Sequence, residues 1–523
     1  MCCEMPYAER QGEAEMQSRG TCPLVLLLLV VLLVGVLGVA QQPQVFTVLY
    51  NEIAEMPFRE DWLILAEYQQ RKNVRLEIQL GDDEDYAGDV ANVLESGRAP
   101  DIILKVWPED VETYAASGML LAFSDYAEWM PYFAEYGDRW DLTEEIDRLR
   151  LADGKFYILP GFQRTAQVQQ WIYRRDLFEK NGLGTPETYD ELFDALVLLR
   201  EADPSATPLT ACWGGAHLLA MMGAGYGIPA GWAGDRLYDA VEDAWRYAPA
   251  TEAFRELHRY LHRCYVTGIL DPAMYTQSVE AYLEKLQDGR ALVAVTWISS
   301  GFENWNRALR EHGIADGEWA PLPVPESTVG IRALPAVDPF RKGLAVPARV
   351  AQEPYLEDLI RFLDWAVYSE EGMTLTAWGV EGVTYEENDT GRALLPHIAS
   401  PRTPEGETSL TAAYGFATLF DLNENVEFED YKRPDEIVAF LERSMAAGET
   451  AQPAPRLDLD SNALQAIDAI GPGLAAFATD ASERFVLGVL DLETEWDVYM
   501  ASLEERGFRT LEAIWNAVWA ASP

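Results

Sequence analysis

Residues that suit the binding of a sugar surround a pair of glycines near position 380. Trp378 directly precedes Gly379, and Glu381 stands between Gly379 and Gly382. A sugar has apolar C–H faces and a rim of hydroxyl groups, so it binds flat aromatic rings and planar polar groups. Trp378 and Glu381 would supply one of each if the glycines turn the chain at the rim of a cleft. The alternative is that Trp378 fills a hydrophobic core.

Four further aromatic residues lie at predicted strand ends, helix starts or loops. Trp107 follows the apolar run 101–106, so it is expected to emerge at the C-terminal end of a strand; packing at a helix start is the alternative. Trp213 opens an expected helix. Tyr226 and Trp232 flank a glycine-rich loop, where packing within the loop is the favoured role of Tyr226. With 16 Trp, 24 Tyr and 19 Phe, the chain has enough aromatic residues for both a core and a binding surface.

Motifs for catalysis or metal binding are incomplete. His258 and His262 have a spacing that can hold a metal, but no Glu follows the first as in HExxH, which favours a solvated helix face. Segment 458–462 begins like a calcium-binding loop, but alanines occupy the positions of the required Gly and Glu. The acidic segment 81–89 is more typical of a solvated loop than of a calcium site. The sequence therefore predicts no catalytic residues, no metal site and no cofactor.

The chain is long and strongly acidic. Its 523 residues predict two or three domains. It has 40 Lys and Arg against 86 Asp and Glu, a net charge of −46, which disfavours nucleic acids and anionic membranes as partners. For the same reason, a neutral sugar is favoured over a sugar acid as ligand.

Residues 1–40 have the order of an export signal. Arg10 and Arg19 precede the unbroken apolar run 24–40, which ends in small residues. An uncleaved membrane anchor is the alternative. In an exported protein Cys212 and Cys264 can form a disulfide, and two buried free thiols are the other possibility.

Short strands alternate with amphipathic helices along the rest of the chain, which is typical of an α/β protein. Strands are predicted at 45–51, 74–80, 101–106, 166–173 and 291–297. Helices are predicted at 57–71, 86–96, 187–201, 214–223, 251–267, 279–287, 356–368 and 510–521.

Five segments, in this order, resemble those of the extracellular solute-binding proteins of ABC importers, family 1, the group that includes maltose-binding protein. They are 99–126, 153–196, 286–305, 359–385 and 495–519. The most specific are "LIRFLDWAVYSEEGMTLTAWGVEGVTY" and "EWDVYMASLEERGFRTLEAIWNAVW". The likeness is strongest to the long carbohydrate-binding members.

The resemblance implies a two-lobe α/β fold of the type II periplasmic-binding-protein class, with a ligand cleft between the lobes and a helical C-terminal extension. Lobe 1 would comprise residues 41–165, with 299–345 returning to it. Lobe 2 would comprise 166–298, joined by the mostly helical 346–523. The chain would cross between the lobes near Pro160–Gln167, Ser299–Gly301 and Gly343–Pro347.

The resemblance also implies three more ligand contacts. Trp297 ends a strand and matches the family's cleft tryptophan. Gln163 and Arg164 occupy the crossover where the maltose-binding relatives place an acidic ligand contact; a salt bridge at the hinge is their alternative role. The full set of candidates is Trp107, Gln163, Arg164, Trp213, Tyr226, Trp232, Trp297, Trp378 and Glu381.

We therefore expect a monomeric, exported binding protein, periplasmic or at the cell surface, without enzymatic activity. It would capture a carbohydrate by lobe closure and deliver it to the permease subunits of an ABC transporter. An oligosaccharide is the favoured ligand. One alternative is an exported glycoside hydrolase, which needs two carboxyl groups about 5–10 Å apart. The other is a binding protein for a peptide or another non-sugar solute.

Overall fold

A computed structural model describes residues 42–52, 57–81, 85–163, 169–297, 302–336, 340–389, 391–399, 406–457 and 459–521. The expected export signal and the candidate Arg164 lie outside these ranges. Residues Val45–Pro523 form one compact unit. In the described part of the chain, no helix combines the length and the apolar character needed to cross a membrane.

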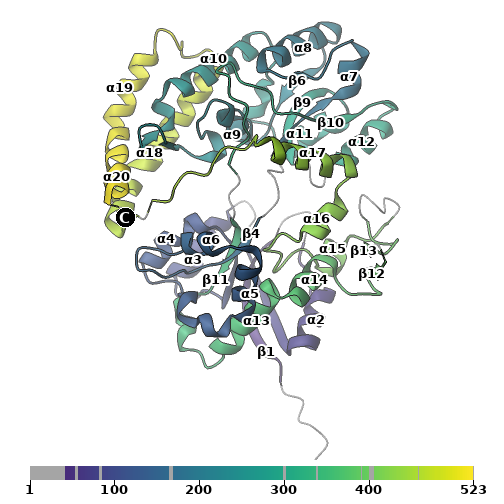
Figure 1. Cartoon of the computed structure of the whole chain (residues 1–523), viewed down its shortest axis with the longest axis vertical. Helices are drawn as coiled ribbons and strands as arrows, with labels where there is room; N and C mark the ends of the chain where they lie inside the picture. The colour runs from purple at the N-terminus through teal and green to yellow at the C-terminus, as the bar shows by residue number, and fades with distance from the viewer. Residues whose placement is uncertain are drawn as a thin grey trace, which may run out of the picture. The chain divides into compact units, whose positions relative to one another are not determined.

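The first sheet has five strands in the order β2-β1-β3-β11-β4. Figure 1 labels three of them, β1, β4 and β11. β1 and β3 are parallel, and β11 runs antiparallel to both β3 and β4. The central strands are continuous apolar runs because helices cover both faces of the sheet. The strands are β1 (Gln44–Asn51), β2 (Val74–Gly81), β3 (Ile102–Val106), β4 (Leu159–Phe162) and β11 (Phe340–Ala345).

The main helices around the first sheet mostly supply side chains to its core. They are α2 (Leu63–Lys72), α3 (Tyr86–Glu95), α4 (Pro108–Ala116), α5 (Pro131–Trp140), α6 (Thr143–Arg148), α13 (Leu356–Tyr368), α14 (Glu370–Trp378) and α16 (Val426–Lys432). α5 packs on α13, where the buried Asp364 carboxylate accepts hydrogen bonds from the Tyr132 and Phe133 amides at 3.0 and 2.7 Å. These amides are unpaired donors of the first turn of α5, so Asp364 caps that helix.

The second sheet has four strands in the order β10-β5-β9-β6. β9 is central, antiparallel to β5 and parallel to β6, as expected for the buried run "ALVAVTW". The strands are β5 (Gln169–Arg174), β6 (Thr207–Thr210), β9 (Ala291–Trp297) and β10 (Trp319–Leu322). The main helices around it are α7 (Arg175–Lys180), α8 (Tyr189–Ala202), α9 (Ala216–Gly225), α10 (Glu252–Val266), α11 (Val279–Gln287), α12 (Phe302–Glu311) and α17 (Asp435–Ala447).

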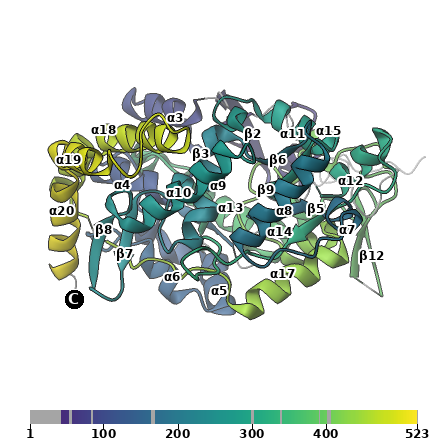
Figure 2. The same cartoon turned by 90° about the horizontal axis from the view of Figure 1, so that it is seen from above.

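The C-terminal helices extend the core of the second sheet. α18 (Ser461–Val486) packs on α10, and α20 (Phe508–Ala521) packs on the hairpin of β7 (Arg236–Asp239) and β8 (Ala244–Tyr247), as Figure 2 shows beside α19 (Trp496–Arg506). The amide of Trp245 donates to Asn516 Oδ1 at 2.8 Å, and that of Tyr247 donates to Glu512 Oε1 at 2.9 Å. Side chains of α20 thus satisfy the free edge of β8.

The predicted strands and helices are confirmed, with ends that shift by a few residues. The main difference is the first helix, predicted from residue 57, which begins at Leu63. Trp62 takes an extended conformation there and donates from Nε1 to the Ala412 carbonyl at 3.0 Å. A contact 350 residues away in the sequence therefore decides where this helix starts.

The strand pairing corrects two of the expected crossings. The first is at the expected place, between β4 and β5. The second was expected near Ser299–Gly301, but β10 pairs with β5, so the chain leaves the second sheet only after Leu322. No crossing occurs at Gly343–Pro347, because α13 and α14 remain in the core of the first sheet. The third crossing instead joins α16 to α17, since Phe428 packs in the first core and Ile437 in a core with Ile172 of the second sheet.

Candidate functional site

Candidate residues of the first sheet meet at one edge. β11 is antiparallel to β3 and to β4, so β3 and β4 run the same way, and β1 is parallel to β3. Their C-terminal ends therefore lie along the same edge of the sheet. Asn51 ends β1, Trp107 follows β3 and Gln163 follows β4. Trp107 is 43% exposed, which leaves its ring available to a ligand.

Lys105 lies at this edge with an unusual backbone. It is inside β3, yet its φ is +56°, and the pairing with β11 shifts register between Gly343 and Leu344. This is a β-bulge, which redirects a side chain. The left-handed conformation costs a non-glycine residue about 1–2 kcal/mol. The Lys105 ammonium donates a hydrogen bond to Oδ1 of the nearly buried Asn51 at the end of β1.

In the second sheet, candidate residues gather at the edge where the first crossing enters. Trp297, the last residue of β9, pairs with Gln169, the first residue of β5. β6 runs parallel to β9 and ends at Thr210, opposite Ala294. Three further residues bring the chain to Trp213. The side chain of Trp297 lies outside the described atoms, so its place at the strand end comes from the backbone.

Trp213 and Trp232 form an exposed aromatic surface with His217 beside them. The ring centroids of Trp213 and Trp232 are 5.0 Å apart, and the two residues are 38% and 46% exposed. The buried His217 ring stacks on Trp232 at 5.0 Å and 19°. Burial lowers the pKa of His217 to about 4, so the imidazole is neutral at pH 7. No pattern in the sequence identified His217 as a candidate site residue.

The backbone around this aromatic surface is specialised. Trp213 has φ +53°, and the next two residues, Gly214 and Gly215, also have positive φ, at +64° and +78°. Gly215 then caps α9, so three left-handed residues turn the chain from β6 into the helix. A Cβ at Gly231 would collide with the Ala216 carbonyl, so only glycine lets the loop carrying Trp232 reach the first turn of α9.

Left-handed backbone conformations at residues other than Gly, Asn and Asp occur mainly at these two strand edges. Six described non-glycine residues have positive φ, and three of them are Asn or Asp, which tolerate it. The others are Lys105, Trp213 and Ala417. Strained residues persist where the surrounding structure holds them, and they cluster at functional sites. The pattern favours both strand edges as parts of a site.

The two edges are covalently tied. Residues 163–168 join Phe162 at the end of β4 to Gln169 at the start of β5. A link of this length spans at most about 25 Å when fully extended. The end of β4, which lies on the same edge as Trp107, is therefore within about 25 Å of Gln169, which pairs with Trp297.

Trp378 is a core residue, so its expected role as a stacking surface for a ligand is wrong in this structure. It has 0% exposure and packs edge-on against Phe428, with centroids 4.9 Å apart, and against Tyr431 at 5.2 Å. Glu381 is exposed in the turn that follows. Gly379 has φ +87°, so the predicted break in the chain is present, but the tryptophan points inward.

Tyr226 packs within the protein, which was its favoured role. It is 2% exposed, and its hydroxyl pairs with Thr328 Oγ1 at 3.0 Å. Its ring stacks with Tyr189 at 6.3 Å and 20°. Burial raises the pKa of Tyr226 to about 12. The structure therefore assigns this residue to the core rather than to a binding surface.

The expected solvated histidine face is wrong for His258, which is fully buried. Its Nδ1 bonds the Phe254 carbonyl at 2.7 Å and its Nε2 pairs with the Ser482 hydroxyl at 2.6 Å. Burial lowers the pKa of His258 to about 4. His262 bonds the Val486 carbonyl at 3.0 Å. Both histidines thus fasten α10 to α18.

Other sequence features also have structural roles. Asp460, in the segment that begins like a calcium loop, caps α18 by accepting from the Ala463 amide at 2.8 Å. The described residues hold no group of three or more metal-ligating side chains. Cys212 and Cys264 are free and buried in different cores, and burial raises the pKa of both thiols.

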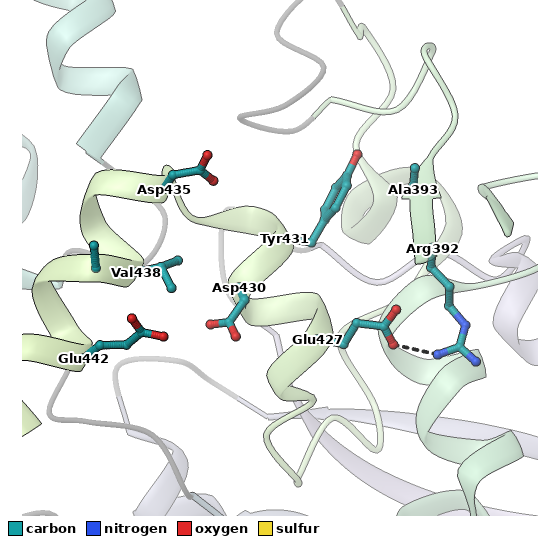
Figure 3. Close-up of a pocket in the computed structure, with 9 residues that line it drawn as sticks. Arg392, Ala393, Glu427, Asp430, Tyr431, Asp435, Val438 and Glu442 are labelled. Atoms are coloured by element: carbon teal, nitrogen blue, oxygen red, sulfur yellow. Dashed lines mark hydrogen bonds and ion pairs between the residues drawn. The ribbon is translucent and has the colours of Figure 1, made fainter. Parts of the chain in front are cut away.

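A separate pocket of about 560 Å³ lies where α16 leads into α17, facing the strand β13 (Gly391–Leu394) (Figure 3). It has carboxylates on several sides, and Arg392 pairs with Glu427 at 2.7 Å. Burial, together with nearby Glu424, raises the pKa of Asp430. The lining residues are Arg392, Ala393, Glu427, Asp430, Tyr431, Asp435, Val438, Ala439 and Glu442. Such a surface suits a cation better than a sugar, which needs broad aromatic faces.

Comparison with known families gives one match to the sequence. A family model described as bacterial extracellular solute-binding protein matches residues 58–366, which is more than half of the chain. No curated protein sequence matches the chain.

Solved structures share the fold. Alginate-binding protein AlgQ2 without calcium ion is similar with a TM-score of 0.77 and 16% identity, over 92% of this chain and 99% of that one. The substrate-binding protein FusA of S. pneumoniae in complex with kestose gives 0.73 and 17%, over 91% and 99%. The N-glycan transport protein NgtS of Streptococcus pneumoniae gives 0.61 and 16%, over 91% and 98%. These likenesses confirm the predicted α/β fold of the type II periplasmic-binding-protein class.

Proposed function

Because this chain belongs to the bacterial extracellular solute-binding proteins, we propose that it captures a carbohydrate outside the cytoplasm and delivers it to the permease of an ABC importer. The ligand is an oligosaccharide held between the C-terminal strand edges of the two sheets. It binds without chemical change, and closure of the two halves retains it because the ligand prefers the closed state.

The observation that carries the proposal is the aromatic surface of Trp213 and Trp232. Two indole rings 5.0 Å apart, each more than a third exposed, present a broad apolar face beside the C-terminal end of β6. A contiguous exposed apolar patch often marks a binding site, and flat indole rings suit stacking on the apolar faces of sugar rings. Trp107 and Gln163 offer a second aromatic face and an amide from the first sheet.

The ligands of solved proteins with this fold support the choice of substrate class. They include alginate for AlgQ2, kestose for FusA and N-glycan for NgtS. All three are oligomeric or polymeric carbohydrates, although the identities of 16–17% carry no information on individual contacts.

The test is a thermal-shift screen of the purified protein against mono- and oligosaccharides, with spermidine and short peptides as further arms. A ligand at 100 times its Kd stabilises the folded state by about 2.7 kcal/mol, which raises the melting temperature measurably. We expect a rise with at least one oligosaccharide. A rise only with spermidine or peptides would refute the carbohydrate proposal. Release of reducing sugar on long incubation with a binding oligosaccharide would instead indicate a glycoside hydrolase.

A further inference from the structure

A positive charge, that of Lys105, lies at the edge of the first sheet, although the chain as a whole is acidic. Lys105 is one of only seven lysines in a chain of net charge −46. Its side chain is partly buried, and its ammonium is held by the neutral amide of Asn51. Within the described ranges, no carboxylate forms an ion pair with Lys105.

Another partly buried lysine shows the usual arrangement. Lys285 is 13% exposed and is neutralised by Asp271 at 2.5 Å. Partly buried charges are normally paired in this way, because removal from water is costly without a counter-charge. With more than twice as many acidic as basic residues, the chain has carboxylates to spare. The pairing of Lys105 with an amide instead leaves its charge uncompensated at this position.

The backbone places that charge where a ligand would meet it. The β-bulge and the φ of +56° at Lys105 redirect its side chain, two residues before the exposed Trp107. An ammonium has three N–H donors, and the Asn51 oxygen takes one of them. The others remain for groups that the described part of the chain does not supply.

The acidic surface does not cancel this local preference. Charges on the surface are screened beyond about 8 Å at physiological ionic strength. A charge at hydrogen-bond distance in a partly buried site acts much more strongly. The overall charge, which favoured a neutral sugar on sequence grounds, is therefore a weaker guide than the one ammonium at the strand edge.

We propose that Lys105 binds the carboxylate of an acidic sugar, so that the protein selects oligosaccharides that contain uronic acid residues. This inference rests on the proposed function, since it names the class of carbohydrate bound at the same strand edges. Lys105 supplies the charge, Asn51 fixes its position, and Trp107 lies close by along the chain to contact the sugar ring.

The experiment compares an oligogalacturonate with its carboxyl-reduced, neutral counterpart by isothermal titration calorimetry of the full chain. We expect the acidic oligosaccharide to bind at least about tenfold more tightly, as for one charged hydrogen bond. Lys105→Met should remove this difference, while Lys105→Arg should keep part of it. Lys180→Met, which removes an exposed lysine at the end of α7, is the matched control and should change neither affinity.

The possible outcomes separate the inference from the proposed function. Equal binding of the two ligands, or an equal loss for both in Lys105→Met, would overturn the inference and leave the proposed function intact. Failure of every carbohydrate to bind would overturn both. If Lys105→Met does not fold, the comparison of Lys105→Arg and Lys105→Gln decides in the same way. Tight binding of sialyllactose but not of lactose, without a preference for the oligogalacturonate, would overturn the assignment to uronic acids.

Discussion

The aromatic surface of Trp213 and Trp232 gives the most direct prediction. Replacing Trp213 by Ala should weaken the binding of a carbohydrate ligand without unfolding the protein, because this residue is 38% exposed and lies outside the buried cores. We expect the loss to appear mainly as faster dissociation of the complex, since changes within one binding surface act mostly on the off-rate.

The magnitude follows from the exposed area. A tryptophan side chain can bury up to about 250 Å², and 38% of this is about 95 Å². At about 25 cal/mol per Å², full coverage by a ligand is worth at most about 2.4 kcal/mol. Since 1.4 kcal/mol corresponds to tenfold in affinity, Trp213→Ala should raise the Kd by up to about 50-fold.

The assay is calorimetric titration with an oligosaccharide that shifts the melting temperature of the native chain. Trp140→Ala is the matched control, because Trp140 is 39% exposed but ends helix α5 and follows no strand. Its Kd should stay within about twofold of the native value, below the size of a typical single contact. A Trp213→Ala variant that is folded and binds within about threefold of the native protein would show that the exposed ring does not touch the ligand.

The remaining predictions concern stability. Trp378→Ala should lower the free energy of unfolding by about 3–5 kcal/mol in urea titrations, because it empties a fully buried site, and Trp378→Phe should cost less; a surface role would leave both variants as stable as the native chain. Burial raises the pKa of Asp364 to about 6, so the folded state holds this proton more tightly than the unfolded chain, and the associated stability is lost as the pH rises from about 4 to about 6. In Asp364→Asn this loss of up to about 3 kcal/mol should disappear from unfolding curves measured across that range, and parallel curves for the two proteins would contradict the assignment. The lowered pKa of His258, about 4, acts in the opposite direction: stability is present above the unfolded value of 6.5 and is lost as the pH falls through 4. His258→Gln should therefore lose less stability between pH 6.5 and 4 than the native chain, and an unchanged acid limb would mean that folding does not lower the pKa of this histidine.

The sequence by itself determined the fold class and the places where strands end. Strand and helix signals are local, so the apolar run before Trp107 and the run "ALVAVTW" that ends in Trp297 correctly located two strand ends. The break at Gly379 was predicted for the same reason, because glycine favours positions of positive φ; Gly214, by contrast, was predicted to start a helix and instead lies in the left-handed turn before α9.

The tertiary structure alone decided which of these residues are exposed. Trp378 is buried by Phe428 and Tyr431, about 50 residues later in the chain, and no local pattern shows that contact. His217 belongs beside Trp232 only because η3 (Gly231–Ala233) folds back on α9.

Lys105 illustrates both what the sequence determines and what only the tertiary structure decides. Its place inside an apolar strand was visible in the sequence, but its left-handed backbone arises opposite β11, more than 230 residues away. Local sequence fixes which conformations a segment prefers, whereas burial, strand register and the pairing of charges depend on residues that only the folded chain brings together.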